Sequence, residues 1–306
     1  MAGRKPIVTC IVNCAAGSNR RAQEATNLSE LFVRNGLDAR VVIADPDNDV
    51  MTLARQAVSD GSEIVIGVGG DGTINAIANA LVGTDVALGV IPLGTFNHFA
   101  KDLKIPLQTE AAVATVASGE TTRIDVGEVN GRIFLNNSSL GIYPWLVRQR
   151  EKLQREGTSK WRAFLSALMS LVTYYPRLYV RLRTQERRER ARETSFVFIG
   201  NNKYDVSGAN AGGRQMLDGG ELWVCRAPRA GQAKLLWLGL RALFGFKPKE
   251  LETLAAHELW IETKSKRARV STDGEIAVLD SPLHYVSRPR ALKVIVPAGT
   301  AAPASA

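Results

Sequence analysis

The residues best suited to bind a phosphate group lie between Gly69 and Asn75, in the sequence GGDGTIN. Bare N–H groups at a glycine-rich turn and a helix N-terminus attract anions, and glycine lets the backbone approach the ligand. Asp71 is unusual in this setting, because a carboxylate repels phosphate unless a cation lies between them. The pattern predicts a nucleotide phosphate site in which Asp71 acts through Mg²⁺. Its members are Gly69, Gly70, Asp71, Gly72, Thr73 and Asn75.

A strand and a helix must hold this turn in place. Residues 64–68 are apolar and mostly β-branched, which is typical of a strand buried on both faces. Apolar residues from Ile74 to Leu81 recur at helical spacing, and Gly83 ends the pattern. An alternative interpretation is a tight βα turn in which Asp71 or Thr73 merely caps the helix. The turn alone leaves both interpretations open.

The first 120 residues alternate between strand and helix patterns, which predicts a doubly wound parallel sheet. Strands are expected at 6–13, 39–44, 64–68 and 86–91, and helices at 19–35, 50–58, 73–81 and 109–118. Ligands of such sheets bind at the carboxyl ends of the strands. We therefore expect three turns to converge there, at residues 13–17, 69–75 and 94–97.

Past about Thr121, short β-rich runs dominate and predict an antiparallel β domain. These runs are 123–129, 132–137, 179–184, 194–200, 221–225, 258–263 and 268–271. Asn130-Gly131 between the first two is a strong hairpin signal. Two amphipathic helical segments, 160–176 and 233–246, interrupt the β domain.

The net charge of +9 is concentrated in one segment. Residues 145–192 hold 13 Lys or Arg against 4 Asp or Glu, a surplus of 9 that equals the value for the whole chain. Tryptophans 145, 161 and 237 lie within or near this segment, which favours contact with an anionic membrane surface. Two helices packed on the sheet, with a solvated basic face, are the alternative. No nucleic-acid motif accompanies the charge.

The remaining composition indicates a protein of a reducing compartment. Cys10, Cys14 and Cys225 lack metal-ligand spacing. The N-terminus leads directly into a strand pattern, which leaves no room for a signal peptide, and no apolar run could span a bilayer. We expect a cytoplasmic protein, peripheral to the inner face of the membrane. The sequence is silent on oligomeric state, and a homodimer is compatible with it.

Together these motifs resemble the diacylglycerol kinase catalytic domain of soluble bacterial lipid kinases, a superfamily shared with sphingosine kinases. The resemblance rests on ordered motifs over nearly the whole chain. They are GGDGTIN at 69–75, PLGTFNHFA at 92–100, the first turn at 13–17, the strand at 137–141, GNNKY at 200–204 followed by DGG at 218–220, and TDGE at 272–275.

The resemblance implies α/β plus all-β architecture: a phosphofructokinase-like doubly wound domain and a β-sandwich domain with helical insertions. The ATP-binding domain would cover 1–122 with a returning segment at about 288–300, and the lipid-substrate domain 123–287. ATP and Mg²⁺ would be the cofactors, with ATP between the domains. Additional nucleotide contacts would come from Asn13, Gly17, Gly94, Thr95 and Asn97. Asp273 or Glu275 of the DGE motif would activate the lipid hydroxyl, although Asp273-Gly274 alone reads as an ordinary hairpin turn.

Several positions depart from the family pattern. Cys14 replaces a proline, Ala44 stands near the place of a nucleotide-contacting threonine, and His98 replaces an aspartate. The second aspartate of the family's DDG segment, which ligates a structural Mg²⁺ in relatives, aligns with Gly219. Only Asp218 remains there as a metal ligand.

Three functions follow as hypotheses. The first is an ATP-dependent lipid kinase that phosphorylates the hydroxyl of a lipid such as diacylglycerol. The second is a non-catalytic, nucleotide-responsive membrane-binding protein that kept the fold with altered sites. The third is an NAD kinase, which shares GGDGT but is disfavoured by the GTFNHFAKDL segment that follows.

Overall fold

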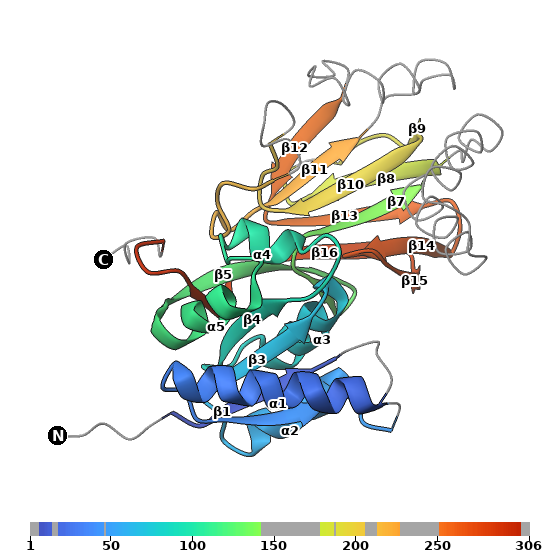
Figure 1. Ribbon diagram of the computed structural model, residues 1–306. Helices are drawn as coiled ribbons and strands as arrows, with labels where there is room; N and C mark the ends of the chain where they lie inside the picture. Colours follow the sequence, from blue (N-terminus) through green and yellow to red (C-terminus); the bar gives the residue numbers. More distant parts are fainter. Residues whose placement is uncertain are drawn as a thin grey trace, which may run out of the picture. The chain divides into compact units, whose positions relative to one another are not determined.

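The structure is a computed structural model that describes residues 6–13, 18–45, 47–141, 178–186, 188–205, 213–226 and 251–300. The chain folds into two compact units. One is Met1–Asp125 together with Arg290–Ala306, and the other is Val126–Pro289. Figure 1 shows the elements of both. The nucleotide and lipid roles expected for the two parts of the chain remain predictions.

The first unit contains a parallel sheet in the order β2-β1-β3-β4-β16. Its strands are β1 (Val8–Val12), β2 (Ala39–Ile43), β3 (Ile64–Gly69), β4 (Ala87–Pro92) and the last residues of β16 (Leu283–Val296). Its helices are α1 (Ser18–Arg34), α2 (Val50–Ser59), α3 (Asp71–Leu81), α4 (His98–Asp102) and α5 (Thr109–Ser118). The doubly wound sheet expected from the sequence is confirmed.

Helices cover both faces of this sheet, which explains why its strands are apolar throughout. α2 packs against α3, and α1 packs against α5 (Figure 1). Every residue of β1 and β4 is buried. A strand covered on both faces needs a continuous apolar run instead of alternation.

The second unit consists of antiparallel strands in two sheets. One sheet contains the first part of β16 with β5 (Glu120–Val129), β6 (Arg132–Phe134), β8 (Leu178–Thr184), β9 (Arg192–Thr194) and β13 (Glu258–Thr263). The other has the order β12-β11-β10-β7-β14-β15, with β7 (Asn137–Gly141), β10 (Phe196–Asn201), β11 (Leu222–Arg226), β12 (Glu252–Ala256), β14 (Arg267–Thr272) and β15 (Glu275–Asp280).

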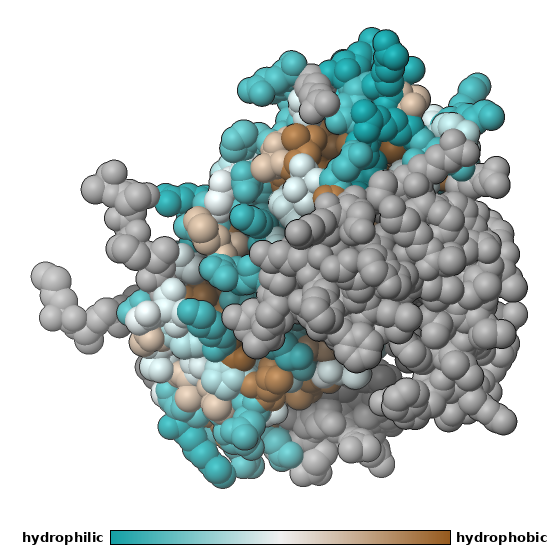
Figure 2. All heavy atoms as spheres, turned by 90° about the horizontal axis from the view of Figure 1, so that it is seen from above, coloured by the Kyte–Doolittle hydropathy of each residue, from teal (hydrophilic) through white to brown (hydrophobic). Residues whose placement is uncertain are grey.

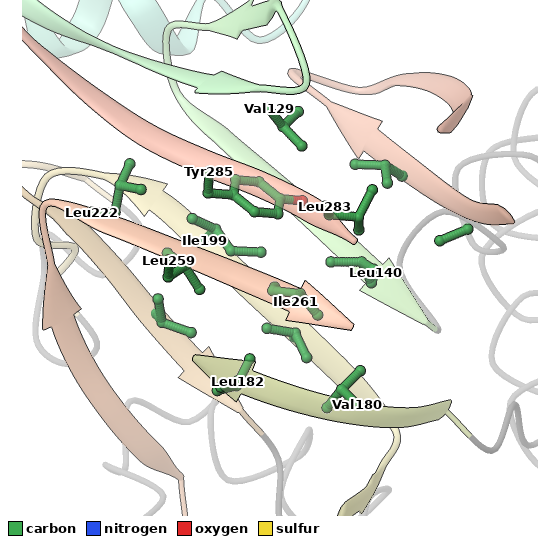
Figure 3. Close-up of a cluster of buried hydrophobic side chains, with 14 of the residues drawn as sticks. Val129, Leu140, Val180, Leu182, Ile199, Leu222, Leu259, Ile261, Leu283 and Tyr285 are labelled. Atoms are coloured by element: carbon green, nitrogen blue, oxygen red, sulfur yellow. The ribbon is translucent and has the colours of Figure 1, made fainter. Parts of the chain in front are cut away.

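The core of this unit is formed by side chains that alternate along strands of both sheets. Leu140 and Ile199 come from one sheet, and Leu259, Ile261 and Tyr285 from the other (Figure 3). The Tyr285 hydroxyl lies 3.0 Å from the Ser138 hydroxyl, so its polar end has a partner inside the core. The antiparallel β-sandwich predicted from the sequence is thus confirmed.

Some element boundaries differ from the sequence-based expectation. The single strand expected at 132–137 is wrong, because the chain bends at Leu135 and Asn136 between β6 and β7. The hairpin at Asn130-Gly131 is present, with Val129 paired to Arg132. Helix α4, β12 and β15 were not predicted. The amphipathic segments 160–176 and 233–246 and the three tryptophans lie outside the described residues.

None of the described helices is long and apolar enough to cross a membrane. Hydrophilic residues predominate on the described surface drawn in Figure 2, with apolar residues interspersed.

Candidate active site

The glycine-rich turn opens directly into α3. Gly70 is the N-cap residue, in an extended conformation, and no side chain caps the helix. The first-turn N–H groups therefore keep their capacity to bind an anion. The interpretation in which Asp71 or Thr73 caps this helix is wrong.

Asp71 instead binds the start of another helix. One carboxylate oxygen accepts the His98 N–H at 3.3 Å, and the other accepts the Phe99 N–H at 3.2 Å. Residues 98 and 99 begin α4, directly after the PLGTFN segment. Asp71 thus ties the two glycine-bearing motifs together. Each oxygen retains a lone pair for a further donor or a hydrated cation.

The two motifs also touch backbone to backbone. A Cβ on Gly94 would lie 2.6 Å from the Gly70 Cα, which is closer than real atoms approach. Asn97 closes the second turn, because its side chain accepts the Gly94 N–H and donates to the Gly94 carbonyl, both at 2.9 Å. Asn97 is buried and left-handed, with φ of 51°. Gly94 is therefore required by space, whereas a Cβ on Gly70 would lie 3.3 Å from the Gly94 Cα, a distance that a small shift relieves.

The first turn reaches the same place. The Asn13 side chain donates to the Thr73 hydroxyl at 3.0 Å, and the Asn13 N–H donates to the Val68 carbonyl at 3.0 Å. Asn13 directly follows β1 and Thr73 lies in the first turn of α3. Contacts thus join the ends of β1, β3 and β4, as expected. Gly17 lies outside the described residues.

The remaining members of this group differ in exposure. Gly72 and Thr95 are exposed at the rim, where a ligand could reach them. Asn75 is engaged along the helix, because its side-chain oxygen accepts from the Asn79 amide at 2.9 Å. Phe96 is also exposed and stacks on the ring of His98 at 5.6 Å. Sequence reasoning did not assign Phe96, and only its place within PLGTFN could have drawn attention to it.

The strand order places a topological switch point at this edge of the sheet. β1 lies between β2 and β3, so the connections after β1 and β3 leave in opposite directions. Open α/β sheets bind ligands at such a switch point, beyond the carboxyl ends of the strands. Asn13 and Gly70 flank this point.

The DGE motif forms a two-residue hairpin turn in the second unit. Thr272 pairs with Glu275, and Asp273 and Gly274 between them have φ values of 48° and 90°. The hairpin interpretation is therefore correct as structure. It is incomplete, because the Asp273 side chain also organises a distant segment.

The Asp273 carboxylate accepts three backbone N–H groups. They belong to Leu135, Asn136 and Asn137, at 2.6, 2.8 and 3.0 Å. Burial raises the pKa of Asp273, while these donors and Arg214 act in the opposite direction. By contrast, Glu275 is exposed and its carboxylate lies 3.5 Å from the Arg132 guanidinium. The two carboxylates of the motif therefore occupy different environments.

Arg214 completes the group around this segment. Its guanidinium donates to the carbonyls of Leu135 and Asn201 at 2.7 and 2.9 Å, and to the Asn136 side chain at 2.9 Å. Arg214 is buried and lies over the Tyr204 ring, 5.6 Å from its centroid. Sequence reasoning missed it, and no local pattern marks a buried arginine.

The residues around Asp218 do not fit the structural metal ion that the resemblance implies. A Cβ on Gly219 would lie 2.7 Å from the Asn202 side-chain oxygen, so this amide occupies the space of the missing aspartate. Asn202 is buried, whereas Asp218 is partly exposed. Across the described ranges, no three His, Cys, Asp or Glu side chains gather in a way that could hold a metal ion.

The sequence of the first unit is similar to a known protein family. Residues 7–129 match the model of the diacylglycerol kinase catalytic domain. Over these residues the chain is similar to that domain. This confirms the resemblance drawn from the motifs, and it places the glycine turn, the PLGTFN segment and Asp71 inside that domain.

Known relatives of the kinase domain extend the match. A diacylglycerol kinase of Mycobacterium tuberculosis is 26% identical over 296 residues, covering 95% of each chain. One from Staphylococcus saprophyticus is 31% identical over 108 residues, or 35% of each chain. The match thus spans only about a third of that relative's length, and less than half of the length of relatives from Klebsiella pneumoniae and Staphylococcus aureus.

Solved structures share the fold. A diacylglycerol kinase from Bacillus anthracis superposes with a TM-score of 0.73 at 21% identity, covering 96% of this chain and 98% of that one. An NAD kinase from Archaeoglobus fulgidus, solved in complex with ATP, gives a TM-score of 0.50 at 13% identity over 94% of this chain and 93% of that one. At these identities the likeness shows the fold alone.

Proposed function

We propose that this protein is an ATP-dependent lipid kinase that transfers the γ-phosphate to the hydroxyl of a lipid such as diacylglycerol. The observation that carries the proposal is the joining of the two glycine motifs at the switch point of the sheet. An uncapped helix N-terminus, a tight Gly70–Gly94 approach and the Asp71 bridge lie together there. The similarity of residues 7–129 to the diacylglycerol kinase catalytic domain supports the same proposal.

In this proposal, the N–H groups of Gly70, Gly72 and Thr73 hold the triphosphate, and the exposed Thr95 lies beside it. Asp71 would hold Mg²⁺ through water, using the lone pairs that its contacts with α4 leave open. The ion supplies charge neutralisation on the phosphates. The protein's part is to fix the phosphate-binding turn, which the contact between Asn13 and Thr73 and the Gly70–Gly94 approach do.

The DGE motif would accept the proton of the acceptor. The lipid oxygen attacks the γ-phosphorus, the bond from that phosphorus to the bridging oxygen breaks, ADP leaves, and a carboxylate takes the hydroxyl proton. The Asp273 carboxylate accepts the N–H groups of Leu135, Asn136 and Asn137. Glu275 is exposed. We propose that one of these two groups is the base.

Labelled ATP and lipid vesicles test this proposal. Wild-type protein is expected to transfer label to diacylglycerol or another lipid alcohol. Asp273→Asn and Glu275→Gln separate the candidate bases, because only replacement of the catalytic base should lower kcat by about 100-fold or more. Label in NAD would instead indicate an NAD kinase. ATP and vesicle binding without turnover on any lipid would indicate the non-catalytic alternative.

We also propose peripheral contact with an anionic membrane through the basic segment. Reversing the charge of Arg187, Arg188 and Arg190 should weaken binding to anionic vesicles in low salt. Reversal of two exposed arginines of the first unit, Arg34 and Arg40, is the matched control. Unchanged, salt-insensitive binding of the first variant would remove this part of the proposal.

A further inference from the structure

The segment Leu135–Asn137 uses every backbone polar group in a contact with the DGE turn or its neighbours. Its three N–H groups donate to the Asp273 carboxylate. The Leu135 carbonyl accepts from Arg214 and from the Asn201 side chain, at 2.7 and 2.9 Å. The Asn136 and Asn137 carbonyls accept the N–H groups of Asn201 and Asp273, both at 2.9 Å.

This arrangement places opposite charges on opposite sides of one stretch of peptide. The anion at Asp273 faces the N–H groups, and the cation at Arg214 faces a carbonyl and the Asn136 side-chain oxygen. Peptide dipoles are then aligned favourably with both charges. Buried charges are tolerated when they are compensated in this way, and removing one partner leaves the other uncompensated.

Among the described residues of this region, no three His, Cys, Asp or Glu side chains gather to hold a metal ion. The Asn202 amide fills the space beside Gly219, and the nearest carboxylate there, Asp218, is partly exposed. A fixed positive charge is nevertheless present among carbonyl and amide oxygens, because the Arg214 guanidinium binds three of them. A guanidinium remains charged at every physiological pH.

We propose that Arg214 serves in place of a bound divalent ion, holding residues 135–137 against Asp273 and thereby positioning the Asp273–Glu275 turn. Arg214 is a positioning residue in this scheme, since it acts through the turn and not on substrate. Its effect on the reaction rests on the proposed kinase function, whereas its role as the local cation does not.

Thermal unfolding of the nucleotide-free protein tests the structural role without turnover. Excess EDTA is expected to leave the unfolding temperature unchanged relative to millimolar Mg²⁺. Arg214→Met should lower it by about 5–10 °C, because buried carbonyl and amide oxygens lose the guanidinium that donates to them. Arg267→Met, at an exposed arginine of the same unit, is the control and should shift it by less than about 2 °C. A chelator-sensitive wild type, or an Arg214→Met variant that melts like the control, would overturn the proposal.

Arg214→Lys separates charge from hydrogen bonding and remains informative if Arg214→Met does not fold. Lysine keeps the charge but lacks the planar fork, so the variant should melt between wild type and Arg214→Met. An Arg214→Lys variant as stable as wild type would show that the fork geometry is unnecessary and would overturn the assignment of three guanidinium contacts.

The pH profile of kcat/KM then reports on positioning. Among the described residues, the Arg214 guanidinium acts electrostatically on the Asp273 carboxylate. If Asp273 is the base, Arg214→Gln should move the acidic limb to higher pH, while Arg214→Lys leaves it in place. An identical limb in all variants would show that Arg214 does not tune the turn. Absence of any lipid turnover would count against the kinase proposal and leave the unfolding result standing.

Discussion

Replacing Asp71 with asparagine should stop phosphoryl transfer in a protein that remains folded. The wild-type carboxylate accepts the His98 and Phe99 N–H groups at 3.3 and 3.2 Å. A capping interaction of this kind is worth about 0.5–2 kcal/mol. Since domains are stable by about 5–15 kcal/mol, the variant stays almost entirely native, and its unfolding temperature falls by about 2–6 °C.

The expected loss of activity is much larger than this loss of stability. Without its charge, residue 71 no longer attracts Mg²⁺ beside the phosphates, and removal of one preorganised electrostatic group typically costs about 10²–10³ in kcat. A hundredfold loss corresponds to about 2.7 kcal/mol in the barrier. Partial unfolding cannot account for it. Steady-state kinetics with ATP and a lipid acceptor, beside thermal unfolding, measure both quantities.

Asp49→Asn is the matched control. Asp49 also caps a helix with its carboxylate, since it accepts the Thr52 N–H at 2.9 Å at the start of α2. Its pKa is lowered by that backbone bond, so the stabilisation is present at neutral pH and is lost as the pH falls below about 4. Asp49→Asn should lose some stability at neutral pH and no activity. Equal activity of the two variants would refute the reasoning about Asp71.

Three further outcomes follow from the packing. Gly94→Ala should abolish ATP binding measured by calorimetry, because the new Cβ would lie 2.6 Å from the backbone of the facing turn. Gly67→Ala is the control and should keep ATP binding, because its Cβ would contact only the side-chain ends of isoleucines. Burial raises the pKa of Cys225 to about 11, so a thiol reagent at pH 8 should label it only after unfolding, and fast labelling of the native protein would contradict its burial. Tyr285→Phe should lower the free energy of unfolding in urea titrations by about 1–2 kcal/mol, because the Ser138 hydroxyl is left unpaired. Adding Ser138→Ala should recover part of this loss. If the destabilisations of the two single variants simply add in the double variant, the hydrogen bond between the two hydroxyls is refuted.

The sequence predicted the local parts of the nucleotide site well. Periodicity and glycine placement are short-range signals, so the strand, turn and helix around Gly70 could be read directly. Convergence of three turns followed from the strand and helix alternation alone. The actual partner of Asp71 could not be read, because its contacts with residues 98 and 99 depend on where another turn folds back.

The second unit was harder to predict because its key contacts are long-range. Residues 132–137 have the composition of one strand, but the Asp273 carboxylate and Arg214 take the peptide groups at 135 and 136 and bend the chain there. Those two residues lie far along the sequence. β16 begins at Leu283, before the returning segment that the resemblance placed at about 288–300.

The central claim is that the joined glycine motifs hold ATP for transfer to a lipid alcohol. The most direct measurement follows γ-labelled phosphate from ATP into extracted lipid, with wild-type, Asp71→Asn and Asp49→Asn proteins side by side. Wild type and Asp49→Asn are expected to produce labelled phospholipid, and Asp71→Asn at least about a hundredfold less. Label in no lipid of a broad alcohol panel, or equal labelling by Asp71→Asn, would contradict it.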